Sequence, residues 1–212
     1  MASVQHVRAS KQLSDKEKAA IEEAVKGVQA SIEKKKENNA KANQERQLVL
    51  VQGYVQNLQP RAVKLEKTHE WNGKFLVNPP ERLGGLGPND SGTFEHEGAT
   101  SQGNLPVLVG SKGAFIYGHF DFALPNLGWL VAWDKPDNSN GPNKVYVDAG
   151  ELSRLMAVDW SEIEQKLDAS ESYSRYFDSA TNAIVAAEIK DTGDKLASLA
   201  SSFHIYVPPP QV

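Results

Sequence analysis

The sequence predicts a mainly β protein with flanking helices, built as a sandwich or a barrel. From residue 48 onward, apolar residues recur with the period of two that strands require. Short runs of this kind are separated by turn-forming segments such as Gly87-Pro88-Asn89-Asp90. The 212-residue chain has no cysteine, so disulfides are excluded and packing alone must hold the interior. Many short strands with frequent turns are typical of β-sandwiches and barrels.

The first 47 residues are expected to form a charged helical appendage. Ser14-Asp15-Lys16-Glu17 has the spacing of a capping box, and apolar residues from Ile21 to Ile32 then follow one narrow helical stripe. The stripe contains no aromatic residue, which favours docking on the protein body over insertion into lipid. We therefore divide the chain into an appendage, residues 1–47, and a β-sandwich domain, residues 48–212.

The elements of the β domain are predicted from their alternation and their flanking turns. The expected strands are residues 48–56, 62–70, 74–78, 106–109, 114–123, 127–134, 144–148, 183–190 and 202–207. One helix is expected at residues 159–167, because Asp159-Trp160-Ser161-Glu162 repeats the capping spacing. Three consecutive prolines, residues 208–210, cannot donate ladder hydrogen bonds and should end the last strand.

The run 127–134 is apolar on both faces, with Trp129, Val131 and Trp133 on one face and Leu130 and Ala132 on the other. It should lie centrally, covered by the opposing sheet on one face and by a helix on the other. Trp129 is expected in the core. Trp133, at the exit of the strand, is expected to be half exposed.

Composition narrows the class of function. Lys and Arg number 23 against 27 Asp and Glu, and this net charge of -4 is the wrong sign for nucleic acid. The N-terminus has no secretory signal pattern, and no apolar run approaches the roughly 20 residues that span a bilayer. We expect a soluble protein, cytoplasmic or non-classically secreted, that is at most peripheral on membranes.

The usual signatures of catalysis are missing from the sequence. No HExxH, P-loop or nucleophile elbow is present, so we expect no enzyme activity, cofactor or metal site. His119 and Asp121 share a strand face at i and i+2, and we interpret them as a surface hydrogen-bonded pair.

Trp133-Asp134-Lys135-Pro136 carries the strongest hint of binding. An aromatic wall beside a carboxylate suits a quaternary ammonium ion, which ring quadrupoles and net charge hold without N–H hydrogen bonds. Core packing remains the commoner role for such rings.

Four segments of the region from about residue 48 to 207 resemble the actinoporin-like β-sandwich group. Within it, the fungal sphingomyelin/cholesterol-binding proteins and the plant jasmonate-induced proteins are the most similar. The segments are His69-Glu70-Trp71-Asn72-Gly73, Gly113-Ala114-Phe115-Ile116-Tyr117, Trp129-Leu130-Val131-Ala132-Trp133-Asp134-Lys135-Pro136 and Asn143-Lys144-Val145-Tyr146-Val147. The resemblance implies a membrane lipid-binding protein that recognises the phosphocholine headgroup of sphingomyelin in sphingomyelin/cholesterol domains.

The resemblance also implies a headgroup site. By position, Asn72 corresponds to a turn serine of the group's phosphocholine pocket, with Trp71 beside it, and Asp134 and Pro136 correspond to its serine and proline. Trp160 corresponds to helix tyrosines of the group. The group's tyrosine-rich loop is here residues 137–142, which contain no aromatic. Aromatic caging is therefore expected from Trp71, Trp133 or Trp160.

Two further expectations concern membrane lysis and the class of ligand. Pore-forming members insert an amphipathic N-terminal helix, but residues 14–47 carry many Lys and Glu residues, which are costly to bury in hydrocarbon. We therefore expect binding without lysis. Exposed Trp with Asp and Asn in β-sandwich loops equally suits sugar recognition, so a carbohydrate-binding lectin is the alternative.

Overall fold

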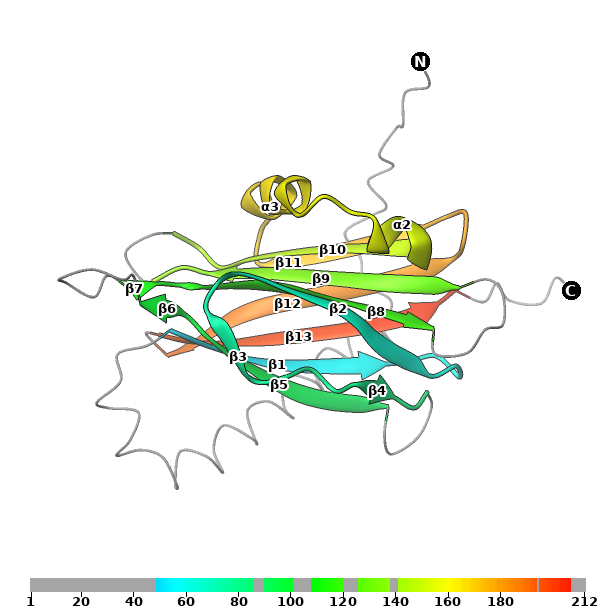
Figure 1. Cartoon of the computed structure of the whole chain (residues 1–212), viewed down its shortest axis with the longest axis horizontal. Helices are drawn as coiled ribbons and strands as arrows, with labels where there is room; N and C mark the ends of the chain where they lie inside the picture. The colour runs from blue at the N-terminus through cyan, green and yellow to red at the C-terminus, as the bar shows by residue number, and fades with distance from the viewer. Residues whose placement is uncertain are drawn as a thin grey trace, which may run out of the picture.

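The computed structural model describes residues 49–85, 90–100, 108–119, 126–137, 141–193 and 195–206. The expected appendage, residues 1–47, lies outside these ranges. Within them, a pair of large sheets pack face to face, and helices lie over one of the sheets (Figure 1). The prediction of a mainly β sandwich with flanking helices is confirmed.

The larger sheet, sheet A, has six strands in the order β11-β12-β13-β1-β5-β3. Their bounds are β11 Tyr173–Asp178, β12 Ala183–Gly193, β13 Leu196–Ile205, β1 Leu50–Asn57, β5 Ser91–Glu97 and β3 Lys74–Val77. The β1–β13 pair is parallel and joins the two ends of the domain, because Leu50 lies opposite Leu196 and Asn57 opposite Phe203. The other pairs of this sheet are antiparallel.

Sheet B has five antiparallel strands in the order β10-β9-β8-β2-β4. Their bounds are β10 Lys144–Glu151, β9 Leu127–Lys135, β8 Ser111–His119, β2 Val63–Asn72 and β4 Arg82–Leu83. A separate two-stranded sheet pairs β6, Ala99–Thr100, with β7, Leu108–Val109.

Two apolar clusters cover the two faces of sheet B. The inner cluster fills the space between the sheets and takes in Trp129, Val131 and Trp133 of β9. The outer cluster lies under the helices and takes in Leu130 and Ala132 of the same strand. The expected division of this strand between an opposing sheet and a helix is confirmed, and it follows directly from the period of two.

The helices in the described ranges are α2, Leu152–Met156, and α3, Trp160–Asp168, and both lie on the outer face of sheet B (Figure 1). The capping spacing located α3 to within one residue. The Asp159 side chain accepts a hydrogen bond from the Ser161 backbone N–H at 2.8 Å and so caps the helix. No helix in the described ranges is long and apolar enough to cross a membrane.

Several elements were not predicted from the sequence. β5 reads SGTFEHE, in which only Phe94 and His96 are buried, and β11 is partly exposed along its whole length. Neither strand shows the strong apolar alternation of a half-buried strand. Pairing with neighbouring strands stabilises both of them without it. β4 and β6 have two residues each and α2 has five, too few for any period to show.

Candidate functional site

Three aromatic rings meet on the outer face of sheet B, at the end of β2 and the start of α3. The His69 ring stacks on Trp160 with centroids 4.5 Å apart and planes 5° from parallel, and it meets Trp71 edge to face at 4.6 Å. Trp71 and Trp160 are themselves in edge contact at 5.8 Å. Both indoles are half-buried. We call these three residues the aromatic cluster.

Local structure explains how β2 and α3 bring these rings together. His69 and Trp71 are two residues apart on a strand and therefore share a face, and His69 lies opposite Ala114 of the outer apolar cluster. Trp71 is the extra residue of a β-bulge, since Glu70 pairs with Gly113 but Asn72 already pairs with Lys112. Trp160 is the first residue of α3, directly after the Asp159 cap.

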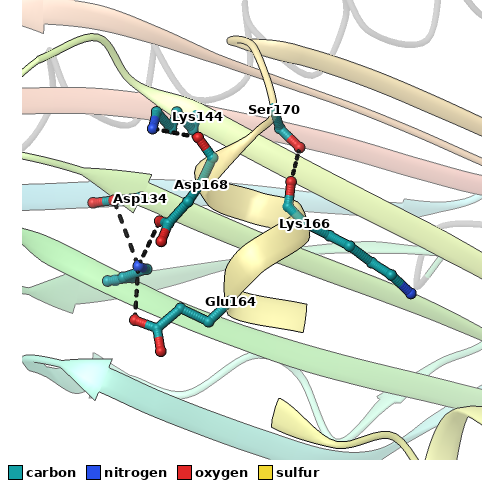
Figure 2. Close-up of polar contacts among 7 residues, drawn as sticks. Asp134, Lys144, Glu164, Lys166, Asp168 and Ser170 are labelled. Atoms are coloured by element: carbon teal, nitrogen blue, oxygen red, sulfur yellow. Dashed lines mark hydrogen bonds and ion pairs between the residues drawn. The ribbon is translucent and has the colours of Figure 1, made fainter. Parts of the chain in front are cut away.

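A nearly buried lysine fastens α3 to the sheet beside this cluster. Lys112 Nζ lies 2.8 Å from Glu164 Oε1 and 2.9 Å from Asp168 Oδ1, both on α3, and 3.9 Å from Asp134 Oδ2 on β9 (Figure 2). Glu164 and Asp168 are four residues apart and so lie on one helix face. Lys144 Nζ also donates to the Asp168 backbone carbonyl at 2.6 Å, at the end of the helix. We call Lys112 with these three carboxylates the Lys112 network.

The pKa values of the network favour a charged Lys112. Burial disfavours the Lys112 ammonium, but hydrogen bonds to Glu164 and Asp168 outweigh it and raise the pKa of Lys112. Burial raises the pKa of Asp134, and the Lys112 ammonium opposes this. Burial, with the neighbouring Lys67 ammonium, lowers the pKa of His69, so this ring is neutral at pH 7.

Both indoles of the aromatic cluster contact an ammonium group of the protein itself. Lys67 Nζ lies over the Trp160 ring, 5.1 Å from its centroid, and Lys112 Nζ lies over Trp71 at 5.9 Å. These distances fall within the range of cation–π attraction. The rings are therefore already oriented to attract positive charge.

Five of the six residues predicted for the site lie toward this end of sheet B. Trp71 and Trp160 are in contact, and Asp134 joins the Lys112 network. Asn72 pairs with Lys112, and Lys112 with Asp134, so the three residues lie in one row across β2, β8 and β9. Pro136 directly follows β9, where its backbone packs against Gly110.

The sixth residue, Trp133, does not contribute to this surface. The expectation that it is half exposed is wrong: it is 0% exposed and lies on the inner face of sheet B. The rings of Phe94, Phe115, His96 and Phe75 surround it at centroid distances of 5.2 to 6.0 Å, and its Nε1 donates to Ser111 Oγ at 3.2 Å. A side chain at the end of a strand faces solvent only where no other strand lies over it. Here β3 and β5 of the opposing sheet A lie over Trp133.

Sequence reasoning missed the residues that support the indoles: His69, Lys67, Lys112, Glu164 and Asp168. The i, i+4 spacing of Glu164 and Asp168 on the predicted helix was an available signal of a shared acidic face. The buried position of Lys112 left no local signal, because its partners lie 52 and 56 residues away in the chain.

One grouping resembles a hydrolase triad, but its serine and histidine are sealed in the core. His96 Nδ1 lies 2.8 Å from Ser111 Oγ, and His96 Nε2 lies 3.9 Å from Glu70 Oε1. The Ser111 and His96 residues are 0% exposed, so no substrate reaches them. Burial also lowers the pKa of His96 to about 4. We assign this grouping to the support of β5 and β8 rather than to catalysis.

His119 and Asp121, which the sequence suggested as a pair, form no site in the described residues. His119 is buried, with Nε2 2.9 Å from Gln59 Oε1, whereas Asp121 lies outside the described residues. In the described ranges no group of three or more His, Asp or Glu side chains is placed to hold a metal ion.

Comparison with known proteins finds structures of similar fold and one protein of similar sequence. The structure is similar to that of the lipid-binding protein Nakanori, with a TM-score of 0.62 and 16% identity, over 94% of this chain and 92% of that one. The sequence is 28% identical over 144 residues to a jasmonate-induced protein homolog of Atriplex canescens, covering 67% of this chain and 72% of the relative. A lectin of Xerocomus chrysenteron is more distant, with a TM-score of 0.44 and 9% identity over 74% of this chain and 99% of the lectin. No protein-family profile matches the chain. The resemblance inferred from the sequence, to jasmonate-induced proteins and to the fold of Nakanori, is thus confirmed.

Proposed function

We propose that this chain is a peripheral, non-lytic lipid-binding protein that recognises the phosphocholine headgroup of sphingomyelin in membranes containing cholesterol. The observation that carries the proposal is the aromatic cluster, in which two half-buried indoles lie beside lysines and carboxylates on one face. The headgroup residues are Trp71, Asn72, Asp134, Pro136 and Trp160. Trp133 is left out because it is buried.

The balance of charge on this face suits a zwitterion. Lys112 contacts the carboxylates of Asp134, Glu164 and Asp168. Lys67 lies over the Trp160 ring and Lys144 bonds the backbone at the end of α3, so three lysines accompany the three carboxylates. A surface with both signs can satisfy a trimethylammonium and a phosphate together, which a purely acidic or purely basic patch cannot. The choline group belongs on the side of the indoles and Asp134, and the phosphate belongs near a lysine or the Asn72 amide.

The internal cations strengthen this assignment. Each indole already has an ammonium within about 6 Å of its centroid. A trimethylammonium group is held by ring contact rather than by N–H hydrogen bonds, so it fits where the Lys67 ammonium now lies. The fold shared with Nakanori, described as lipid-binding, is consistent with such a ligand.

A vesicle co-sedimentation panel tests the proposal. The vesicles contain sphingomyelin with cholesterol, sphingomyelin alone, phosphatidylcholine with cholesterol, or phosphatidylserine with cholesterol. We expect the strongest binding to the first and competition by free phosphocholine. Trp71→Ala and Asp134→Asn should weaken that binding, whereas Tyr206→Ala, which removes an exposed aromatic from the end of β13, should not.

Two outcomes would contradict the proposal. Equal recovery with every lipid, or with none, would remove the headgroup assignment. Competition by simple sugars but not by phosphocholine would indicate the carbohydrate-binding alternative, which uses the same rings as a stacking platform. Release of an encapsulated dye from sphingomyelin/cholesterol vesicles at saturating protein would contradict only the non-lytic character.

A further inference from the structure

Two adjacent apolar side chains are exposed on β3, the edge strand of sheet A. Leu76 is 49% and Val77 is 42% exposed. The other large apolar residues exposed in the described ranges, Met156 and Tyr206, lie singly elsewhere in the fold. Single exposed apolar residues are ordinary, whereas an adjacent pair on an unpaired edge requires an explanation.

A β-bulge places this pair side by side. Phe75 lies opposite His96 and Val77 lies opposite Glu95, the next residue of β5, so Leu76 is the extra residue. In a regular strand consecutive side chains point to opposite faces, but here two neighbours are both exposed. A bulged strand of four residues is a poor template for an added strand. The pair is therefore suited to a partner that contacts side chains rather than the backbone.

A short, well-anchored corner joins the pair to Asn72 of the proposed headgroup site. β3 begins two residues after Asn72, at a corner formed by Gly73 with φ +102°, where any side chain would overlap the Glu97 carbonyl oxygen. The Phe75 backbone N–H donates to Glu70 Oε1 at 2.7 Å, and its ring meets His96 at 4.9 Å. Val77 is five positions after Asn72, so at most about 18 Å of chain joins them.

We infer that Leu76 and Val77 enter the upper acyl region of the bilayer while the aromatic cluster holds a headgroup. This inference rests on the proposed function and specifies how the protein lies on the membrane. Two side chains are far too small an area for a stable dimer, which needs roughly 1,200 Å² or more. Lys74, two residues before Leu76, is 68% exposed, and its ammonium lies 3.1 Å from Glu97 Oε1, so a charged pair borders the apolar pair where the lipid headgroups would lie.

Site-specific labelling tests the inference cleanly, because the chain has no cysteine of its own. Leu76→Cys and Met156→Cys are each labelled with an environment-sensitive nitrobenzoxadiazole dye and mixed with sphingomyelin/cholesterol vesicles. We expect a blue shift and quenching by spin-labelled acyl chains for the dye at position 76 only. A dye at position 76 that stays in water while the protein is bound would overturn the inference.

A matched pair of unlabelled variants provides the second measurement. Leu76→Ser/Val77→Ser should partition about tenfold more weakly into the same vesicles. Met156→Ser/Tyr206→Ser, which also removes two exposed apolar side chains, should bind like the wild type. Because all four residues are exposed, thermal melts monitored by circular dichroism should show every variant folded.

The results separate this inference from the proposed function. If the wild type binds and the double variant at positions 76 and 77 binds equally well, the inference is wrong and the headgroup proposal stands. If the wild type binds no choline lipid, the proposed function fails first. A loss of dimer in light scattering with unchanged vesicle binding would assign the pair to self-association and also overturn the inference.

Discussion

The two faces of sheet B carry tryptophans of opposite character. On the inner face, Trp133 has its indole N–H bonded to Ser111 and is 0% exposed among aromatic rings. On the outer face, Trp71 and Trp160 are half-buried and contact a histidine, each other and two lysines. The inner ring is enclosed by packing on all sides, whereas the outer rings pack on the sheet, on each other and beside two lysine ammonium groups. Only the second arrangement leaves rings accessible to a ligand.

The largest expected difference between the faces is in stability. Trp133→Ala should lower the free energy of unfolding by about 3–5 kcal/mol, because it leaves a large cavity in the core. Urea denaturation followed by circular dichroism measures this. Trp133→Phe, which keeps a ring but loses the N–H, serves as control and should cost less. A loss below about 1 kcal/mol for Trp133→Ala would show that this face is not a packed core.

The inner face should also make stability depend on pH through His96. Burial lowers the pKa of His96 from 6.5 to about 4, so between these values the unfolded chain binds a proton that the folded chain does not. Stability is therefore highest above pH 6.5 and falls as the pH drops toward 4, by up to about 3 kcal/mol from this residue.

Denaturation of the wild type and of His96→Gln at pH 7, 5.5 and 4 measures this contribution. The wild type should lose more stability than the variant across that range. Identical pH profiles for the two proteins would show that His96 is not buried in its neutral form.

On the outer face, the Lys112 network should have an intermediate effect. Lys112→Met keeps most of the buried stem but leaves three carboxylates without their shared ammonium, and should cost about 1–3 kcal/mol. The pKa of Lys112 is raised, so its contribution should persist through neutral pH and disappear only as the pH rises above 10.5.

Vesicle binding shows whether Lys112 also positions the site. If this lysine holds Trp160 in place by fastening α3, Lys112→Met should weaken sphingomyelin binding together with stability. Lys166→Met, on the same helix with Nζ 5.9 Å from the Tyr146 ring, is the control and should change neither strongly. Full binding by Lys112→Met would separate the network from the site.

The smallest effect on stability, and the sharpest on binding, is expected at Trp160. Trp160→Ala removes a half-buried ring and should cost only about 1 kcal/mol of stability. It should weaken vesicle binding about tenfold, because one cation–π partner and the stacking on His69 are both lost. Isothermal titration with sphingomyelin/cholesterol vesicles measures the affinity. Unchanged affinity with a normal melt would exclude this ring from headgroup recognition.

Much of the fold was predictable from local patterns. The period of two located β9 and correctly assigned its two faces, and the capping spacing located α3. β5 and β11 escaped prediction because sheet pairing rather than their own apolar pattern sustains them. The candidate site was named by resemblance, which pointed to Asn72, Asp134 and Trp71, and these residues stay a prediction. The exposure of each ring could not be predicted, because it depends on what lies across from it.

By itself, then, the sequence determined the β-sandwich class, the central strand β9 and helix α3, because period and capping act over a few residues. The tertiary structure decided that Trp133 is core, and that Trp71 and Trp160 meet beside Lys112. The reason is physical: burial and ion pairing depend on groups brought close in space. The ion partners of Lys112 on α3 are more than fifty residues away along the chain, a separation at which no sequence period carries information.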